Sequence, residues 1–179
     1  MKTKKLVITA LFAAIICLIA PVSVKIGIIP MSLASFAVYL IASMANWQIS
    51  LSAVTIYILL GAFGVPVFAG YNGGFNVIIG LTGGYIIGYL PCALCTSLFC
   101  KKFSSKLFMY PCGMILGTVL LYGIGTAWYM ALSGNSFFTA FASCVAPFLV
   151  FDAIKIAAAS LAGFLVRSRL PQKLLEGIC

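Results

Sequence analysis

Two residues of opposite charge lie close together in an apolar part of this sequence. Asp152 and Lys155 are three residues apart, so they share one face of a helix, and the run from Phe137 to Val166 around them is largely apolar. Asp152 is one of two acidic residues in the chain; the other is Glu176. A charge at the centre of a membrane helix costs about 2.5–3.5 kcal/mol on the mildest scale. The pair therefore requires a polar partner, a water-filled cavity or a ligand.

The composition predicts an all-α integral membrane protein. Of the 179 residues, 64% are hydrophobic and 7% are charged, whereas soluble domains average roughly 45–50% apolar and about 25% charged residues. The net charge of +9 comes from basic residues at the ends of apolar runs. This placement indicates membrane topology, so we expect a lipid bilayer around the chain and no nucleic-acid partner.

The apolar runs predict six transmembrane helices in a single domain that covers residues 1–179. A helix needs about 20 apolar residues to cross the hydrocarbon core, and glycine, proline and polar residues mark the breaks. The expected spans are residues 6–21, 31–46, 49–63, 77–100, 107–132 and 144–167.

The basic residues predict the orientation of these helices. With the N-terminus inside, nine of the eleven basic residues fall on the cytoplasmic side, as the positive-inside rule requires. Lys25 then lies outside and Lys155 lies within the membrane. We therefore expect a multi-pass protein of the plasma membrane with both termini in the cytoplasm. Asp152 and Lys155 fall in the outer half of the bundle, on the same side as the loop from Gly64 to Asn76.

This Gly/Pro-rich loop is the second candidate feature. Its glycines allow unusual backbone shapes, and its aromatic side chains can cover a ligand. Asn76 is expected near the start of the fourth helix, where free amide groups favour polar or anionic ligand groups. The alternative is an ordinary turn between helices. After it, Gly80, Gly84 and Gly88 recur every four residues, a spacing that lets helices pack closely.

The cysteines offer a different chemistry. Cys92 and Cys95 form a Cys-x-x-Cys pair, which would suit a membrane thiol oxidoreductase. No further ligands complete a zinc site around this pair, and cysteine in an apolar helix is often a small packing residue. The predicted topology also puts both cysteines near the reducing cytoplasmic side. We expect no metal, no cofactor and no catalytic residue.

Several segments together resemble one family, the BioY proteins, which are the biotin-binding S components of energy-coupling-factor (ECF) transporters. They are the runs 61–70, 73–74 and 80–88, the last with Thr-Gly-Gly-Tyr, and Pro-Phe-Leu-x-x-Asp-x-x-Lys at 147–155. The resemblance covers essentially the whole chain. Leu81 stands where the family usually has proline. Residues 30–34 read Pro-Met-Ser-Leu-Ala where the family usually has Pro-x-Thr-Leu-Gln, and the lost glutamine weakens any expectation that this segment contacts ligand.

The resemblance implies the S-component fold and a substrate-capture subunit that is not an enzyme. Such subunits work with a transmembrane coupling protein, the T component, and two cytoplasmic ATPases. The chain itself has no Gly-x-x-x-x-Gly-Lys-[Ser/Thr] phosphate loop, so partner chains must hydrolyse ATP. The resemblance further implies that Ala10 and Ala14, one turn apart on the first helix, dock the coupling protein.

The resemblance also implies the ligand and its site. We expect Asn76, Asp152 and Lys155 to bind biotin from outside, Asp152 by accepting from the ureido N–H groups. Lys155 can donate to the ureido oxygen or neutralise the carboxylate, and the sequence leaves both open. The expected apolar walls are Tyr85, Phe68 and Trp128. The alternatives are an S component for another vitamin, and a structural role for the charge pair in joining helices.

Overall fold

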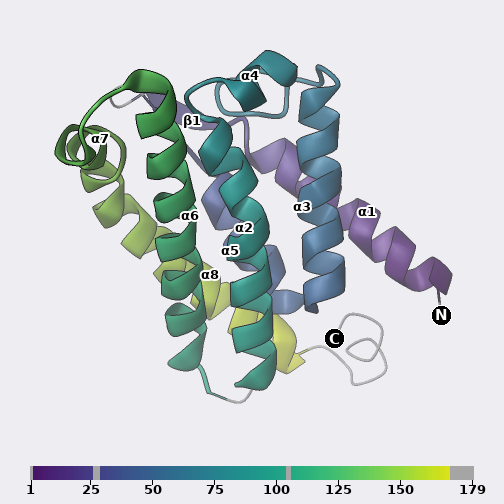
Figure 1. Ribbon diagram of the computed structural model, residues 1–179. Coiled ribbons are helices and arrows are strands. Elements are labelled where there is room, and N and C mark those ends of the chain that lie inside the picture. Colours follow the sequence, from purple (N-terminus) through teal and green to yellow (C-terminus); the bar gives the residue numbers. More distant parts are fainter. Residues whose placement is uncertain (1, 26–28, 104–105, 170–179) are drawn as a thin grey trace.

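The computed structural model describes residues 2–25, 29–103 and 106–169, which form a helical bundle with one short hairpin (Figure 1). In chain order the elements are α1 (Lys2–Ile19), β1 (Ser23–Lys25), β2 (Pro30–Ser32), α2 (Ala34–Met44), α3 (Trp47–Ala62), α4 (Phe75–Ile79), α5 (Gly83–Lys102), α6 (Met109–Ser133), α7 (Phe137–Cys144), the 3-10 turn η1 (Ala146–Phe148) and α8 (Leu149–Arg169).

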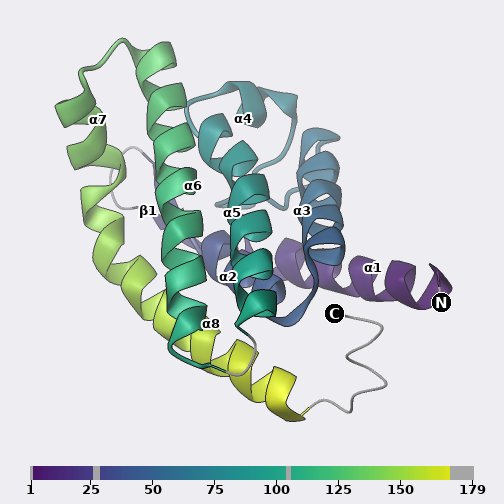
Figure 2. The same cartoon turned by 60° about the horizontal axis from the view of Figure 1, so that its bottom comes forward.

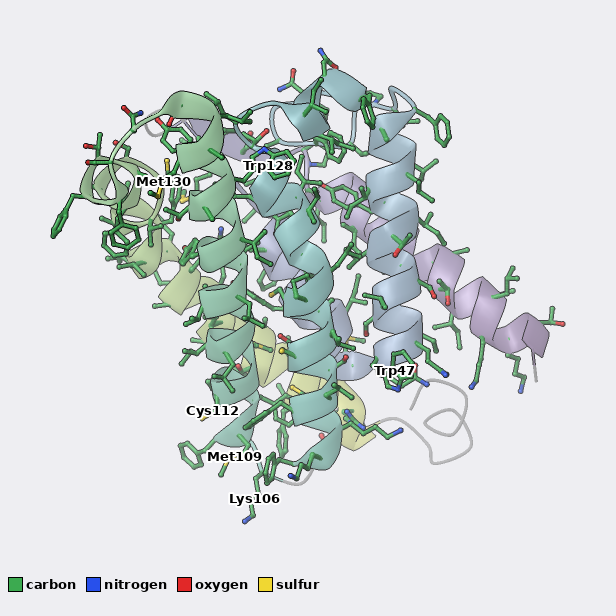
Figure 3. All side chains as sticks on the ribbon, in the orientation of Figure 1. Trp47, Lys106, Met109, Cys112, Trp128 and Met130 are labelled. Atoms are coloured by element: carbon green, nitrogen blue, oxygen red, sulfur yellow. The ribbon has the colours of Figure 1, made fainter. Side chains whose placement is uncertain are left out.

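The helices α2 and α5 pack against each other, and α5 lies between α3 and α6. In Figures 1 and 2, α5 and α6 run side by side and α3 flanks α5. In Figure 1, α8 crosses behind α5 and α6 at a slant. The helix α1 leans away from the bundle. One end carries α4 and the β1–β2 hairpin, in which Val24 faces Met31 in an antiparallel register. Figure 3 places Trp128 near this end and Trp47 and Lys106 at the opposite end.

Glycines bring α5 and α6 into close contact. A Cβ atom on Gly84 would lie 2.3 Å from the Cβ of Trp128, and one on Gly117 would lie 2.9 Å from the Cys92 carbonyl oxygen. Only a glycine allows such an approach of backbones. The predicted packing role therefore holds for Gly84. Gly80 has a different role, because it lies in the break before α5 and its carbonyl accepts a bond of 3.0 Å from Trp128 Nε1.

The helices α2 and α8 run parallel to each other. Ser35, near the start of α2, contacts Asp152 near the start of α8. Ser43 lies beside Gly163, about two turns further along α2 and about three turns further along α8. A Cβ atom on Gly163 would lie 2.0 Å from Ser43 Oγ. This tight contact sets how far α2 is displaced along α8, and so which α2 residues face Asp152.

Three expected helical spans differ from the structure in their boundaries. The segment 77–100 is divided, because the backbone at Gly80 is extended and separates α4 from α5. The segment 31–46 starts in β2, whose pairing with β1 takes up its first residues. The segment 144–167 contains the end of α7, a 3-10 turn with Pro147, and then α8. Proline lacks the N–H that a continuous helix would need.

Three helical stretches among the described residues are long and apolar enough to cross a membrane: Gly83–Lys102, Met109–Ser133 and Phe137–Arg169. The apolar helices Ala34–Met44 and Trp47–Ala62 are shorter. At 1.5 Å per residue, the 11 residues of α2 cover about 16 Å, roughly half of a hydrocarbon core of about 30 Å. The described residues thus form a largely helical protein with three clear candidates for membrane spans, and the six spans that the sequence predicts stay a prediction.

The close contact between Gly163 and Ser43 can be used to test how tightly α2 and α8 pack. Gly163→Ala should lower the thermal unfolding midpoint in detergent, because the added methyl group overlaps Ser43 and overpacking typically costs about 1–3 kcal/mol. The matched control is Gly123→Ala on α6, where a Cβ atom would meet nothing within 4 Å. The control should be neutral or slightly stabilising, since alanine favours a helix more than glycine does. Equal midpoints for the two variants would contradict this packing.

Candidate ligand-binding site

A small cavity lies between β2, the start of α2, and α5, α6 and α8. Its volume is about 60 Å³, and both Asp152 and Lys155 line it. A second cavity of about 340 Å³ extends beneath the loop between α3 and α4. The two cavities share part of their walls: Ile29, Pro30, Ser32, Tyr85 and Tyr89. The charged pair therefore stands at the narrow end of a larger, mainly apolar space.

Asp152 and Lys155 form an ion pair within α8. Lys155 Nζ lies 3.0 Å from Asp152 Oδ1, and both side chains are buried. Lys155 Nζ also donates to the Ser32 carbonyl oxygen at 2.8 Å and to Ser35 Oγ at 3.1 Å. Ser35 Oγ in turn donates to Asp152 Oδ1 at 3.3 Å. Three elements, β2, α2 and α8, thus meet at one polar cluster.

Tyr122 completes this cluster from α6. Its hydroxyl donates to Asp152 Oδ2, so both carboxylate oxygens have protein donors. One turn before it on α6, the Thr118 hydroxyl bonds to the Tyr39 hydroxyl of α2 at 2.7 Å. Buried polar groups that lack a partner are costly. These bonds hold the carboxylate in place inside an apolar bundle.

Part of the segment 30–34 lines the smaller cavity. Pro30, Met31 and Ser32 line the cavity together with Ser35, and Ser32 contacts Lys155 through its main-chain carbonyl. The lost glutamine weakened the expectation that this segment contacts ligand, and that expectation stays untested. A main-chain contact does not depend on the side chain, so the change from the family's usual glutamine to Ala34 leaves it intact.

The other predicted residues divide into two groups. Tyr85 lines both cavities, and Phe68 lines the larger one, where its ring packs edge-on against Tyr57 at 5.6 Å. Asn76 and Trp128 line neither cavity. The Asn76 side chain is exposed on α4. Trp128 Nε1 donates a hydrogen bond to the carbonyl oxygen of Gly80, between α4 and α5.

The spacing of polar residues in the sequence indicates cavity residues that we did not predict, among them Ser35, Tyr89 and Tyr122. Three helices carry polar side chains every four residues, which places them on one face of an otherwise apolar helix. The stripes are Ser35, Tyr39 and Ser43 on α2; Tyr85 and Tyr89 on α5; and Thr118, Tyr122 and Thr126 on α6. Members of each stripe contact the cavity or the Asp152 cluster.

The glycine-rich loop folds back onto α3 beside the larger cavity. Gly64, Gly70 and Gly74 adopt positive φ angles of 95°, 72° and 105°, which favour glycine. Asn72, in the same loop, lines the larger cavity. Phe68 is buried against Gly61, where a Cβ atom would lie 2.1 Å from its ring. The loop thus covers the larger cavity with a fixed aromatic side chain.

Two further sets of predicted residues lie away from the cavities. Ala10 and Ala14 are both exposed, on one face of α1. Cys92 and Cys95 are free thiols on α5, and Cys92 is fully buried against Gly117 of α6. A thiol that exchanges disulfides must be accessible, so this burial disfavours redox chemistry at the Cys-x-x-Cys pair.

The ion pair predicts how single and double substitutions change the unfolding free energy of the ligand-free protein. Lys155→Met should lower the unfolding free energy by about 3–5 kcal/mol, because it leaves a buried carboxylate without its cation. Adding Asp152→Asn should recover most of this loss, since a neutral pair has no uncompensated charge. The exposed Lys106→Met serves as the control. Thermal or denaturant unfolding in detergent measures all of these variants. A double variant as unstable as Lys155→Met would contradict the pairing.

Comparison with known proteins places the chain in a family. Residues 1–172 match the model of the BioY family. The chain is 36% identical over 159 residues to the probable biotin transporter BioY of Pyrococcus horikoshii, covering 89% of this chain and 93% of that protein. It is 32% identical over 158 residues to the biotin transporter BioY of Thermotoga maritima, covering 88% and 92%.

The fold also matches a solved structure. The crystal structure of the S component for biotin from an ECF-type ABC transporter aligns with a TM-score of 0.88, over 97% of this chain and 96% of that chain, at 23% sequence identity. The chain therefore has the S-component fold. With the sequence matches, which extend over nearly its whole length, this shows that the chain belongs to the BioY family.

Proposed function

We propose that this chain is the biotin-binding S component of an ECF transporter and that it binds biotin in the cavity at Asp152. The observation that carries the proposal is a buried carboxylate at the narrow end of an otherwise largely apolar cavity, in a member of the BioY family. Intramembrane charges that line a cavity are typical of substrate sites. The relatives named as biotin transporters supply the ligand.

The chemistry of biotin suits this cavity. Its ureido ring has two N–H donors, and Asp152 is an acceptor whose charge strengthens hydrogen bonds in a dry site. Tyr85, Tyr89 and Phe148 line the cavity beside Asp152 and offer aromatic surface to the fused rings. The larger cavity, lined by Phe68, offers room for the valerate chain.

Asn76 remains a prediction from the family resemblance. Its side chain is exposed on α4 in the present structure, next to Gly74. For Asn76 to contact a ligand in either cavity, α4 and the loop before it would have to turn.

We further propose that the chain spans the plasma membrane with both termini in the cytoplasm, and that a T component and two ATPases drive import. The orientation is supported by basic residues at the end of the bundle opposite α4: Lys101 and Lys102 end α5, Lys106 lies near them, and Arg167 and Arg169 end α8. The predicted outer end thus carries α4 and the hairpin.

Biotin binding by the purified protein tests the ligand assignment. Wild type should bind labelled biotin, and Asp152→Asn should bind it about 10- to 100-fold more weakly, because a charge-assisted hydrogen bond contributes about 1.5–3 kcal/mol. A thermal-shift panel of other vitamins separates biotin from the alternative ligands. Absence of biotin binding by wild type would refute the proposed function, and unchanged affinity in Asp152→Asn would refute the site.

Asn76→Ala belongs in the same experiment as a comparison. From its exposed position we expect an affinity within about twofold of wild type. A loss as large as that of Asp152→Asn would instead support the residue assignment from the family resemblance, and would imply a movement of α4 on binding.

The exposed face of α1 gives a separate test of partner docking. Ala10→Leu and Ala14→Leu should retain biotin binding but lose co-purification with the T component and biotin uptake in cells, since small residues allow close helix contact. Ala158→Leu, at an exposed alanine of α8, is the matched control. Normal uptake by both α1 variants would exclude docking at this face.

A further inference from the structure

An apolar seam runs along the outside of the bundle between α6 and α8. It consists of two grooves: the α6–α7 groove of about 430 Å³, which also reaches the start of α8, and the α6–α8 groove of about 400 Å³. The grooves adjoin, because Val119, Tyr122 and Leu149 line both. At 1.5 Å per residue, the seam extends about 28 Å along α6 from Pro111 to Met130, close to the hydrocarbon thickness of about 30 Å.

The seam faces the region where lipid chains would lie. Both flanking stretches, Met109–Ser133 and Phe137–Arg169, are long and apolar enough to cross a membrane. The lining residues Val119 and Leu149 are exposed, and no charged residue other than Asp152 lines either groove. In Figure 1, α6 and α7 lie on the side of the bundle away from α1, so the seam is separate from the predicted docking face of α1.

The polar groups at the floor of the seam already have protein partners. The hydroxyl groups of Thr118, Tyr122 and Thr126 bond to Tyr39, Asp152 and Tyr85, respectively. A polar occupant would lose its hydration in the seam without finding a free partner among these groups, which is unfavourable. The chemistry of the seam therefore favours a purely apolar occupant.

The size of the grooves favours a thin chain over a helix. One turn of an α-helix is about 5.4 Å long and 10–12 Å wide, so it fills roughly 400–600 Å³. Each groove would hold only about one such turn. A helix laid over the seam would leave the floor unfilled, and a void forfeits the dispersion contacts of its lining. An acyl chain is narrow and flexible enough to enter, and the bilayer supplies it at this position.

Tyr122 forms the wall between the seam and the smaller cavity. Its side chain lines both grooves as well as the cavity, and its hydroxyl donates to Asp152 Oδ2. Asp152 itself lines the cavity and the α6–α8 groove. When the groove is empty, one side of the Tyr122 ring lacks packing contacts. The occupant of the seam thus affects how firmly the carboxylate is held.

We propose that the seam between α6 and α8 binds acyl chains of bilayer lipids, and that this packing acts through Tyr122 to hold Asp152 in place. The lipid site stands on the two grooves alone. Its effect on biotin binding rests on the proposed function and deepens it, because biotin affinity then depends on the lipid around the protein. In this role Tyr122 is a positioning residue.

Lipid retention tests the seam directly. Protein extracted in digitonin, which has a rigid steroid skeleton in place of an alkyl tail, should retain phospholipid in native mass spectra. Ala157→Leu places a side chain in the α6–α8 groove and should lower the lipid-bound fraction about threefold or more. Ala158→Leu is the matched control, because Ala158 is exposed on α8 and lines neither groove. Equal retention by wild type and both variants would overturn the lipid site.

Biotin affinity in two environments tests the role of Tyr122. Wild type in lipid nanodiscs should bind biotin several-fold more tightly than delipidated wild type in digitonin, and added phosphatidylcholine should restore the affinity. Ala157→Leu should bind about equally in both, because its own side chain fills the groove. Tyr122→Phe should bind more weakly and show no lipid dependence, since its bond to Asp152 is lost.

Two results would contradict the coupling between lipid and ligand. One is a wild-type affinity for biotin that agrees within about twofold between nanodiscs and digitonin although lipid is retained at the seam. The other is a lipid dependence that persists unchanged in Tyr122→Phe. Failure of wild type to bind biotin in either environment would refute the proposed function and with it the coupling, while the retention of lipid would still decide whether the seam is a lipid site.

Discussion

The structure depends on a pair of opposite charges buried in an apolar bundle. Taking Asp152 and Lys155 out of water is expensive, and their mutual attraction offsets this cost only when further hydrogen bonds satisfy both groups. Ser32, Ser35 and Tyr122 supply these bonds from three other elements. The pair thus constrains where β2, α2 and α6 lie relative to α8, although the two charged residues are neighbours on a single helix.

Close helix packing makes this convergence possible. Gly163 lets α2 approach α8, and Gly84 and Gly117 let α5 and α6 approach each other. A side chain at any of these positions would overlap a neighbour, so the neighbouring side chain or helix would have to shift. The glycines are therefore part of the site's geometry even though they lie outside the polar cluster. The break at Gly80, held by Trp128, leaves room for α4 and the loop that covers the larger cavity.

Much of the candidate site was visible in the sequence. The spacing of Asp152 and Lys155 indicated a shared helix face, and the structure has both in one cavity. The polar stripes on α2 and α6 were equally visible, but a stripe alone does not tell which neighbouring helix it faces. The contact of Ser32 with Lys155 could not be predicted, because a main-chain carbonyl makes it and side-chain identity does not indicate such a contact.

The sequence by itself determined the class of the protein, the presence of a buried charge pair and the family, because composition, spacing and motifs are properties of the chain alone. Only the tertiary structure decided which groups satisfy Asp152 and Lys155, that α2 runs parallel to α8, and that Asn76 and Trp128 lie outside the cavities. These features depend on contacts between residues far apart in the chain. The direction of a side chain follows from helix packing and backbone breaks, which local sequence does not specify.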